Sequence, residues 1–499
     1  MNLKLALFAF AATGLLAVSA DAQVFDGSGM TVYPGFVDAL TNVGMQAAGP
    51  QTSPTPGGQA AAPASAPSNS NYPVGLRPEV VASDGLRGGE AQFESVRNAG
   101  FTTVVTVGRT GIFNGQSAII NLAGESVSGM ILKAPFAEHV SFATVSGQYP
   151  GSLLGTFSAL RQMFLDAQRL QELQKMYAAN PRGMKRPDKD ASLEALFPLL
   201  DRQMPIVFNA NREIEIVRAL DFAKEFNLKA IIAGGQEAWK VVDRLKAQDV
   251  PVLLSLNFPK RTAAASPDAD PDSMDLLRFR AETPKAAARL QQAGVKFAFQ
   301  SGGTTTLADF FANAGKTVEN GLSRDAAIRS MTLGSAEILG VGDRLGSIET
   351  GKVANLAVVK GDLFGKDRFV SNVFVDGRPF EQKAQPAEKR APTGGAPAAL
   401  AQVGGNFAIT IEVPGQQLTG TLALTQQAAI LTGSLQTQLG SSPIKDGKVT
   451  AEGFSFAATV EFGGTQIEIL VKGTVTGNDI RGTIDSPQGN VPFSGRRNP

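Results

Sequence analysis

Short hydrophobic runs alternate with segments of helical spacing through the middle of the chain. The runs expected to form strands are 205–209, 229–233, 251–256 and 295–300; the expected helices are the segment with Ile216, Val217, Leu220 and Ala223 on one face, then 236–248 and 283–293. Strands buried on both faces read as continuous apolar runs, and helix-length segments between them predict parallel β/α units. We therefore expect an α/β protein with a (β/α)8 TIM-like barrel, whose site lies at the carboxyl ends of the strands.

The same pattern begins earlier in the chain and is interrupted once. Phe36 and Val37 begin a buried strand, the β-branched run 101–107 predicts another, and a long helix is expected over 153–177. Residues 46–73 are rich in Pro, Ala, Gly, Ser and Gln and lack the apolar spacing that would offset the entropy of ordering them. We expect a disordered insert there, within one barrel domain at 23–383.

The pattern changes after a Pro/Ala/Gly-rich linker at 384–400. From 401 to 499 no long helical pattern occurs, and alternating apolar and polar residues are separated by turn signals such as Lys445–Lys448. This predicts a C-terminal all-β antiparallel domain, either a small β-barrel or a sandwich.

The amino terminus has the pattern of a signal peptide. Lys4 precedes an apolar stretch at 5–18, and Ala20-Asp21-Ala22 fits a cleavage site that leaves Gln23 as the mature start. The alternative is a retained anchor, although the apolar stretch is short for a membrane span. We expect residues 1–22 to be removed and the protein to be exported, periplasmic or secreted, with no membrane span afterwards.

Composition excludes several kinds of chemistry. The formal net charge is +1, from 46 basic and 45 acidic residues, so no basic excess favours nucleic acid as a partner. The absence of cysteine excludes disulfides, zinc–thiolate sites and a cysteine nucleophile. The single histidine, His139, cannot supply the several imidazoles that metal hydrolases commonly use.

Several short motifs carry a family resemblance. Residues 34–42 read P-G-F-V-D-A-L-T-N, residues 343–358 read D-R-L-G-S-I-E-T-G-K-V-A-N-L-A-V, and residues 372–377 read N-V-F-V-D-G. Over residues 24–382 the chain resembles the amidohydrolase superfamily, specifically its exported imidazolonepropionase-like members. The resemblance implies a metal-dependent hydrolase of C–N bonds other than peptide bonds. It also implies a composite small β-sandwich, here truncated because only 23–33 precede Pro34.

The resemblance also indicates that the metal ligands are missing. The family's ligand positions fall on Leu40, Asn42, Asn209, the small residues at 233–235 and Gly302, and a bridging carboxylated lysine would fall on Lys133. Leucine and glycine side chains cannot coordinate a cation, and asparagine is a weak zinc ligand. We expect a degenerate copy, a pseudoenzyme with no metal, no cofactor and no catalytic residue of the family.

The strand ends still carry polar residues. We expect a degenerate pocket lined by Asp38, Leu40, Asn42, Asn209, Asn211, Arg212, Ser301 and Gly302, which could bind a small polar molecule. The alternative is a set of ordinary loop residues that face solvent. Residues 300–306 join a strand to a helix and could hold an anion, or form a glycine turn with a threonine cap.

Three further patterns allow a chemical and a structural interpretation. His139, next to Glu138, could be a general base or a surface or packing histidine near a helix start. Residues 115–119 have the outline of a nucleophile elbow but lack its second glycine and a second histidine. Alternate aspartates in 268–272 begin like a calcium loop but lack the turn glycine and the terminal glutamate, so a solvated loop is expected.

Two functions remain open at this point. The first is a non-catalytic binding protein or partner subunit, which pairs with an active amidohydrolase relative in a hetero-oligomer. The second is an active C–N hydrolase with an unrecognised site. The missing ligands favour the first.

Overall fold

The structure is a computed structural model of the chain. It describes residues 27–45, 72–73, 75–87, 90–108, 111–124, 126–142, 149–260, 272–302, 306–381, 401–413, 416–437, 440–450, 453–462, 465–486 and 489–498. Contacts divide the chain into two units, Met1–Ala384 and Gln385–Pro499, which are described separately. The predictions for 1–22, 46–71 and 384–400 fall outside the described residues.

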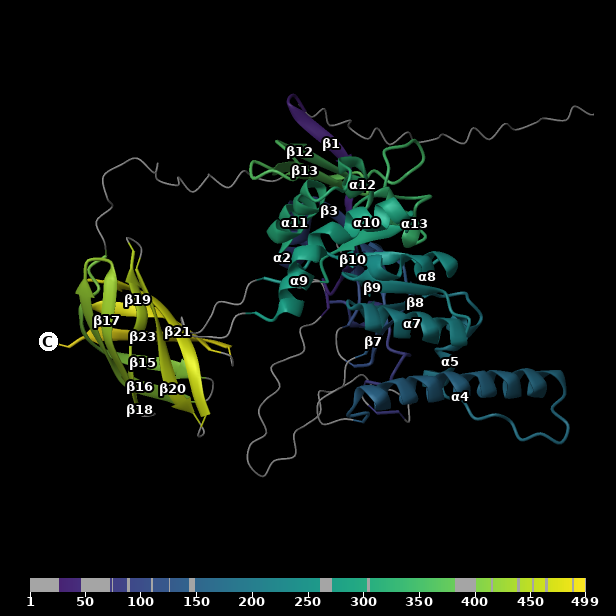
Figure 1. Ribbon diagram of the computed structural model, residues 1–499, viewed down its shortest axis with the longest axis horizontal. Coiled ribbons are helices and arrows are strands. Elements are labelled where there is room, and N and C mark those ends of the chain that lie inside the picture. Colours follow the sequence, from purple (N-terminus) through teal and green to yellow (C-terminus); the bar gives the residue numbers. More distant parts are fainter. Residues whose placement is uncertain are drawn as a thin grey trace, which may run out of the picture. The chain divides into compact units, whose positions relative to one another are not determined.

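The first unit alternates strands and helices over most of its length (Figure 1). Its strands are β1 Met30–Pro34, β2 Phe36–Thr41, β3 Phe101–Thr106, β4 Phe113–Gln116, β5 Ala118–Asn121, β6 Ile131–Lys133, β7 Glu138–Ser141, β8 Ile206–Ala210, β9 Ala230–Gly234, β10 Val252–Ser255, β11 Phe297–Gln300, β12 Leu356–Lys360, β13 Phe369–Val375 and β14 Arg378–Glu381. Its helices are α1 Ala82–Gly85, α2 Glu90–Asn98, α3 Val127–Met130, α4 Leu153–Ala179, α5 Ala191–Glu194, α6 Phe197–Leu200, α7 Glu213–Glu225, η1 Ala238–Val241, α8 Val242–Ala247, α9 Met274–Glu282, η2 Thr283–Lys285, α10 Ala286–Ala293, α11 Leu307–Glu319, α12 Arg324–Arg329 and α13 Leu333–Ile338. The expected strands β8 to β11 are confirmed to within two residues at each end.

Hydrogen bonds connect the strands of the first unit into a ring. β7, β8, β9, β10 and β11 pair in parallel, and β2 pairs in parallel with β3. The backbone N–H of Gly302, just after β11, donates to the carbonyl of Leu40 in β2 at 3.0 Å. The carboxyl ends of these parallel strands therefore share one end of the ring.

The segment β4–β5, which lies between β3 and β7 in the ring, runs antiparallel to both neighbours. The sequence pattern predicts only parallel strands. β5 pairs antiparallel with β3, and β4 pairs antiparallel with β7. Ser117 links β4 to β5, and its N–H donates to the carbonyl of Ala137 at 2.8 Å. The physical reason is chain length, because a short connection can join antiparallel neighbours whereas a parallel crossover needs a dozen or more residues.

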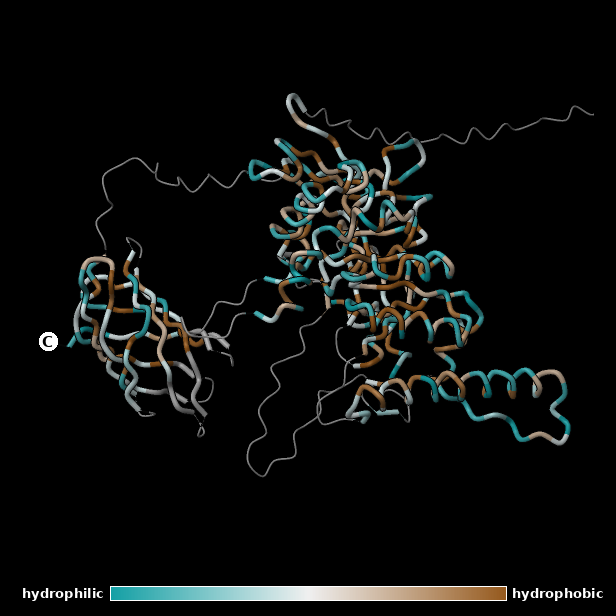
Figure 2. The backbone as a smooth tube through the Cα atoms, in the orientation of Figure 1, coloured by the Kyte–Doolittle hydropathy of each residue, from teal (hydrophilic) through white to brown (hydrophobic). Residues whose placement is uncertain are grey.

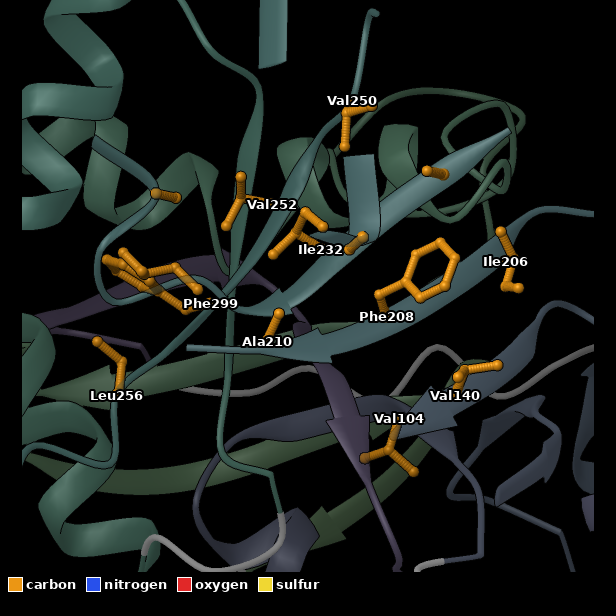
Figure 3. Packing of buried hydrophobic residues seen from close by; sticks show 14 of the residues in the cluster. Val104, Val140, Ile206, Phe208, Ala210, Ile232, Val250, Val252, Leu256 and Phe299 are labelled. Carbon is orange, nitrogen blue, oxygen red and sulfur yellow. The ribbon is translucent and has the colours of Figure 1, made fainter. Parts of the chain in front are cut away.

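Two apolar layers hold the ring together. The inner cluster takes side chains from all around the ring, namely Val37, Val105, Ile119, Ala137, Val207, Ile231, Leu253 and Ala298. The outer faces pack against helices. Figure 3 shows Phe208, Ile232 and Val252 on three neighbouring strands, and these residues belong to the same cluster as Ile216 and Leu220 of α7. Hydrophobic positions accordingly gather on the strands and hydrophilic ones on the outer helix surfaces (Figure 2).

A separate sheet joins both ends of the first unit. Its order is β1-β12-β13-β14, with all pairs antiparallel. β1 is the single strand in it that precedes the ring, and the other three follow the ring. The described part of the chain thus contains a small composite sheet with a short amino-terminal contribution.

The second unit is an antiparallel β-barrel. Its strands are β15 Gly405–Val413, β16 Gln416–Gln427, β17 Ile430–Thr437, β18 Gly440–Pro443, β19 Lys445–Val449, β20 Phe454–Phe462, β21 Thr465–Thr476, β22 Asp479–Ser486 and β23 Gly489–Arg497. The sheet order β16-β15-β23-β22-β21-β20-β19-β17 closes through an additional β16–β17 pairing, and β18 attaches to β17. Alternate residues such as Phe407, Leu422 and Phe456 fill its core. Of the two expected forms, the barrel is the one found.

The long helix expected over 153–177 is present as α4. None of the helices in the described part of the chain is long and apolar enough to cross a membrane. His139 is fully buried, which agrees with a packing histidine, but it lies within strand β7 and not near a helix start.

Candidate functional site

Asp38 of the P-G-F-V-D motif bridges the first and last strands of the ring. Its Oδ1 accepts hydrogen bonds from the backbone N–H groups of Leu40, at 3.3 Å, and Ser301, at 3.0 Å. Gly302, whose N–H donates to Leu40 O, lies in the same cluster. The structure thus brings together four of the eight residues expected in the degenerate pocket.

Burial raises the pKa of Asp38 to about 6, although hydrogen bonds from the Ser301 side chain, the Ser301 N–H and the Leu40 N–H lower it. The side chain is 1% exposed, so water does not replace these partners. A carboxyl group held this way fastens β2 to β11.

The motif glycine and the tail motifs also have structural explanations. A Cβ at Gly35 would collide with the side chain of Thr102, so this position accommodates only glycine without a shift. Asn355 donates to Asn121 at 2.9 Å and accepts from the N–H of Asp376 at 2.9 Å. Asn121 in turn donates to the Asp376 carboxylate at 2.6 Å, so both tail motifs tie the small sheet to the ring.

Asn209 belongs to a second, separate polar group. Its Nδ2 donates to Asn114 Oδ1 at 3.0 Å and to Ser141 Oγ at 2.9 Å. The Ser141 hydroxyl donates to the same Asn114 oxygen at 2.7 Å. Sequence reasoning missed Asn114 and Ser141, because neither lies in a recognisable motif and only strand pairing brings them to Asn209.

Asn211 and Arg212 lie in a third place, at the start of helix α7. Their backbone N–H groups both donate to Glu215 Oε2, at 2.8 and 3.0 Å, and so begin helix α7. The Arg212 guanidinium contacts Glu237 at 3.4 Å and stacks on Phe279 at 3.8 Å from the ring centroid. These contacts engage Arg212 at the surface.

Asn42 is partly buried, and its carbonyl accepts a hydrogen bond from Met45 N–H at 3.1 Å. Within the described residues, no hydrogen bond or ion pair joins Asn42 to the Asp38 cluster, to Asn209 or to Arg212. The eight expected pocket residues therefore occupy several distinct environments.

The donor set at the carboxyl ends does not fit a hydrolytic metal. Leu40 is 8% exposed and packs in the inner apolar cluster, Ala233 belongs to the same cluster, and Asn209 is already hydrogen-bonded. Within the described ranges, no three His, Asp or Glu side chains are placed to hold a metal ion. A catalytic zinc needs three protein ligands and an open position. Lys133 lies elsewhere, in a pocket beside Pro205 and Pro251, which precede β8 and β10.

Ser117 and His139, far apart in sequence, form a direct hydrogen bond. His139 Nε2 lies 2.9 Å from Ser117 Oγ, and Ser117 Oγ donates to Ala137 O at 3.2 Å. The hydroxyl therefore accepts from Nε2–H, and burial lowers the pKa of His139 to about 3, which keeps the ring neutral. Both residues are fully buried, and Nδ1 has no partner within the described structure. Without an orienting acid or access this pair lacks the geometry of a catalytic triad.

Glu138 is a buried acid that sequence reasoning did not single out by itself. Burial raises the pKa of Glu138 well above its usual range, and the nearby charge of Glu79 raises it further. The side chain is completely buried. Its pairing partner on β8 is Ile206, whose side chain belongs to the outer cluster, so Glu138 lies on the outer face of β7.

The turn at 300–306 and the aspartates in 268–272 are the two remaining candidates from the sequence, and their described residues make common structural contacts. Thr306 Oγ1 accepts from Asp309 N at 3.1 Å and caps α11, which supports the threonine-cap interpretation. Residues 303–305 and 261–271 fall outside the described residues, and Asp272 pairs with Arg280 at 2.7 Å.

Comparisons with known proteins relate the chain to amidohydrolases. Residues 268–380 match the Amidohydrolase family model. An amidohydrolase structure from Thermotoga maritima is 25% identical, with a TM-score of 0.60, and covers 73% of this chain and 90% of that one. A Xaa-Pro dipeptidase with bound methionine is 18% identical, with a TM-score of 0.40, and covers 71% of this chain and 87% of that one. No curated protein matches the chain significantly.

The first unit is thus a mixed α/β protein with an amidohydrolase fold. The family-model match over residues 268–380 and this structural likeness relate the chain to the amidohydrolase superfamily, a superfamily of metal-dependent hydrolases.

Proposed function

We propose that the first unit is a (β/α)8 TIM-like barrel with a truncated small β-sandwich that has lost the metal chemistry of its superfamily. In this proposal β2, β3, the β4–β5 segment and β7 to β11 are the eight barrel strands, with one of them reversed. The small sheet β1-β12-β13-β14 corresponds to the sandwich. The chain then acts as a non-catalytic subunit that pairs with an active amidohydrolase relative.

One contrast carries this proposal. The family-like residues that the chain retains, Gly35, Asp38 and Asp376, all make packing or hydrogen-bond contacts that hold the fold together. The positions that would bind metal carry leucine, asparagine and glycine. A binding protein or partner subunit needs the folded shape of the barrel but does not need the metal ligands that catalyse hydrolysis. The chain keeps the residues for the first and lacks those for the second.

Location and small-molecule binding extend this proposal. The amino-terminal pattern of residues 1–22 supports export, where the partner would also be found. A small polar ligand is a second candidate occupant, because the Asn114–Ser141–Asn209 group is partly buried and polar.

Co-expression tests the pairing. The tagged chain is expressed with each amidohydrolase of the native host that has histidine at the positions of Leu40 and Asn42. The molar masses of the purified complexes are measured by light scattering. We expect one relative to co-purify in fixed stoichiometry and its hydrolytic rate to change at least several-fold. If every candidate remains separate at micromolar concentration, the partner role is wrong.

The alternative, an active C–N hydrolase, predicts turnover by this chain alone. Purified chain is assayed with N-acyl amino acids and hydantoins, with and without added zinc or manganese. We expect no turnover above that of the heat-denatured chain. Turnover that Ser117→Ala abolishes would identify the Ser117–His139 pair as a site, and turnover that survives this change would locate the reaction elsewhere; either result contradicts the non-catalytic proposal.

A further inference from the structure

A pocket of about 510 Å³ lies at the end of the ring opposite to the expected site. Its walls include Pro205, Lys229 and Pro251, which immediately precede β8, β9 and β10, and Leu339, which follows α13. Because these strands are parallel, their amino-terminal ends meet there, whereas Asn209 marks a carboxyl end. We refer to this pocket as the amino-terminal basin.

Four cationic side chains line the basin: Lys133, Arg202, Lys224 and Lys229. Asp249 is the one carboxylate among the residues that line the basin. Its Oδ1 lies 3.6 Å from the Nζ of Lys296, which is not one of the four cations. None of the four cations has an ion pair with a described carboxylate, although many other lysines and arginines of the described chain do. The whole chain carries a net charge of only +1, so this concentration of charge is local.

Arg202 is held in place at the rim. Its guanidinium Nη1 donates to Asn227 O at 2.8 Å and to Asn227 Oδ1 at 3.0 Å. Its backbone has φ 56°, the left-handed region where a side chain is unfavourable and glycine is preferred. An arginine at such a turn is not explained by local backbone preference, and both Arg202 and its partner Asn227 line the basin.

The floor of the basin is apolar. Phe136, Ile231 and Leu339 belong to the inner cluster or its edge, and Lys133 Nζ lies 5.4 Å from the Phe136 ring centroid. Pockets of this volume accommodate small molecules. Arginine and lysine recognise phosphate and carboxylate groups through charge-assisted hydrogen bonds.

We propose that the amino-terminal basin binds a small organic molecule that carries two or more negative charges. The cations hold its phosphate or carboxylate groups at the rim, and its carbon frame packs on the apolar floor. This site is separate from the carboxyl-end residues, and its occupancy does not depend on whether the chain pairs with a relative.

Calorimetric titration of the full chain with pyrophosphate and with citrate tests the proposal, at an ionic strength matched with sodium chloride. We expect saturable binding of at least one probe with one site per chain, weakened at least tenfold in the double variant Lys224→Gln/Lys229→Gln. Binding of pyrophosphate alone identifies a phosphorylated ligand, and binding of citrate alone identifies a polycarboxylate. A second double variant, Lys175→Gln/Lys366→Gln, removes two exposed lysines that do not line the basin and serves as the matched control.

Arg202→Gly separates binding from folding. Glycine suits the backbone of residue 202, so this variant should melt at the same temperature as the parent or higher, while its affinity for the probe falls at least tenfold. Absence of saturable binding by either probe overturns the proposal. Equal affinities in the parent, the Lys224/Lys229 variant and Arg202→Gly overturn it as well.

Discussion

Replacement of Asp38 by asparagine should make the stability of the first unit less dependent on pH. The ordinary pKa of this acid is 3.8, and burial raises it to about 6 in the folded chain. The folded state therefore binds more protons than the unfolded state, so the contribution of Asp38 is fully present below pH ~4 and is lost as pH rises through about 6. At ~1.4 kcal/mol per pKa unit the loss is about 3 kcal/mol. The asparagine side chain of the variant keeps an oxygen for the Leu40 and Ser301 N–H donors and does not titrate.

Urea unfolding of the full chain at pH 4.5, 5.5, 6.5 and 7.5 measures this effect. Trp239 is the single tryptophan of the chain and lies in the first unit, so its fluorescence reports that unit alone. The free energy of unfolding of the parent minus that of Asp38→Asn should fall by about 2 kcal/mol between pH 4.5 and pH 7.5, because about a third of the full loss has already occurred at pH 4.5. Asp343→Asn, at an exposed turn, should show no such trend. A pH-independent difference, or a parent that gains stability relative to Asp38→Asn as pH rises, would refute the reasoning.

Three further predictions follow from other parts of the chain. Glu138→Gln should stabilise the first unit at pH 7–8 and leave it unchanged near pH 4, because the raised pKa of Glu138 means that its contribution is lost as pH rises; a urea series with Trp239 fluorescence checks the sign, and a loss of stability at pH 8 would contradict it. Asn355→Ala should lower the free energy of unfolding by about 1–3 kcal/mol, since it leaves buried partners without hydrogen bonds; an unchanged urea midpoint would show that these bonds contribute nothing. Brief trypsin treatment should cut within 384–400 and release a fragment that still unfolds cooperatively by circular dichroism; a fragment without a transition would mean that the second unit does not fold alone.

Much of the fold was predictable because buried strands leave a local signature. The runs that became β8 to β11 are apolar over most of their length, as parallel strands between two packed layers must be. The reversed segment 113–121 is equally buried, so its direction could not be read from composition. Strand direction depends on the length of the connections on either side.

The site was less predictable because its contacts are long-range. Asp38 and Ser301 are 263 positions apart, and Asn209 meets Asn114 across 95 positions. The motif singled out Asp38 but could not show that its carboxylate joins β2 to β11, because this contact requires the two strands to lie side by side in the fold. The cations of the amino-terminal basin come from separate segments, and none of these segments is basic enough by itself to attract attention.

Metal analysis tests the central claim most directly. The full chain is purified without chelator, its zinc, iron and manganese are measured by elemental mass spectrometry, and melting is followed with Trp239 fluorescence in EDTA and in added zinc. The account predicts far less than one transition metal per chain and a melting temperature that neither treatment changes, because nothing that binds only the folded state is removed or added. One transition metal per chain, together with a melting temperature that falls in EDTA and recovers with zinc, would contradict it.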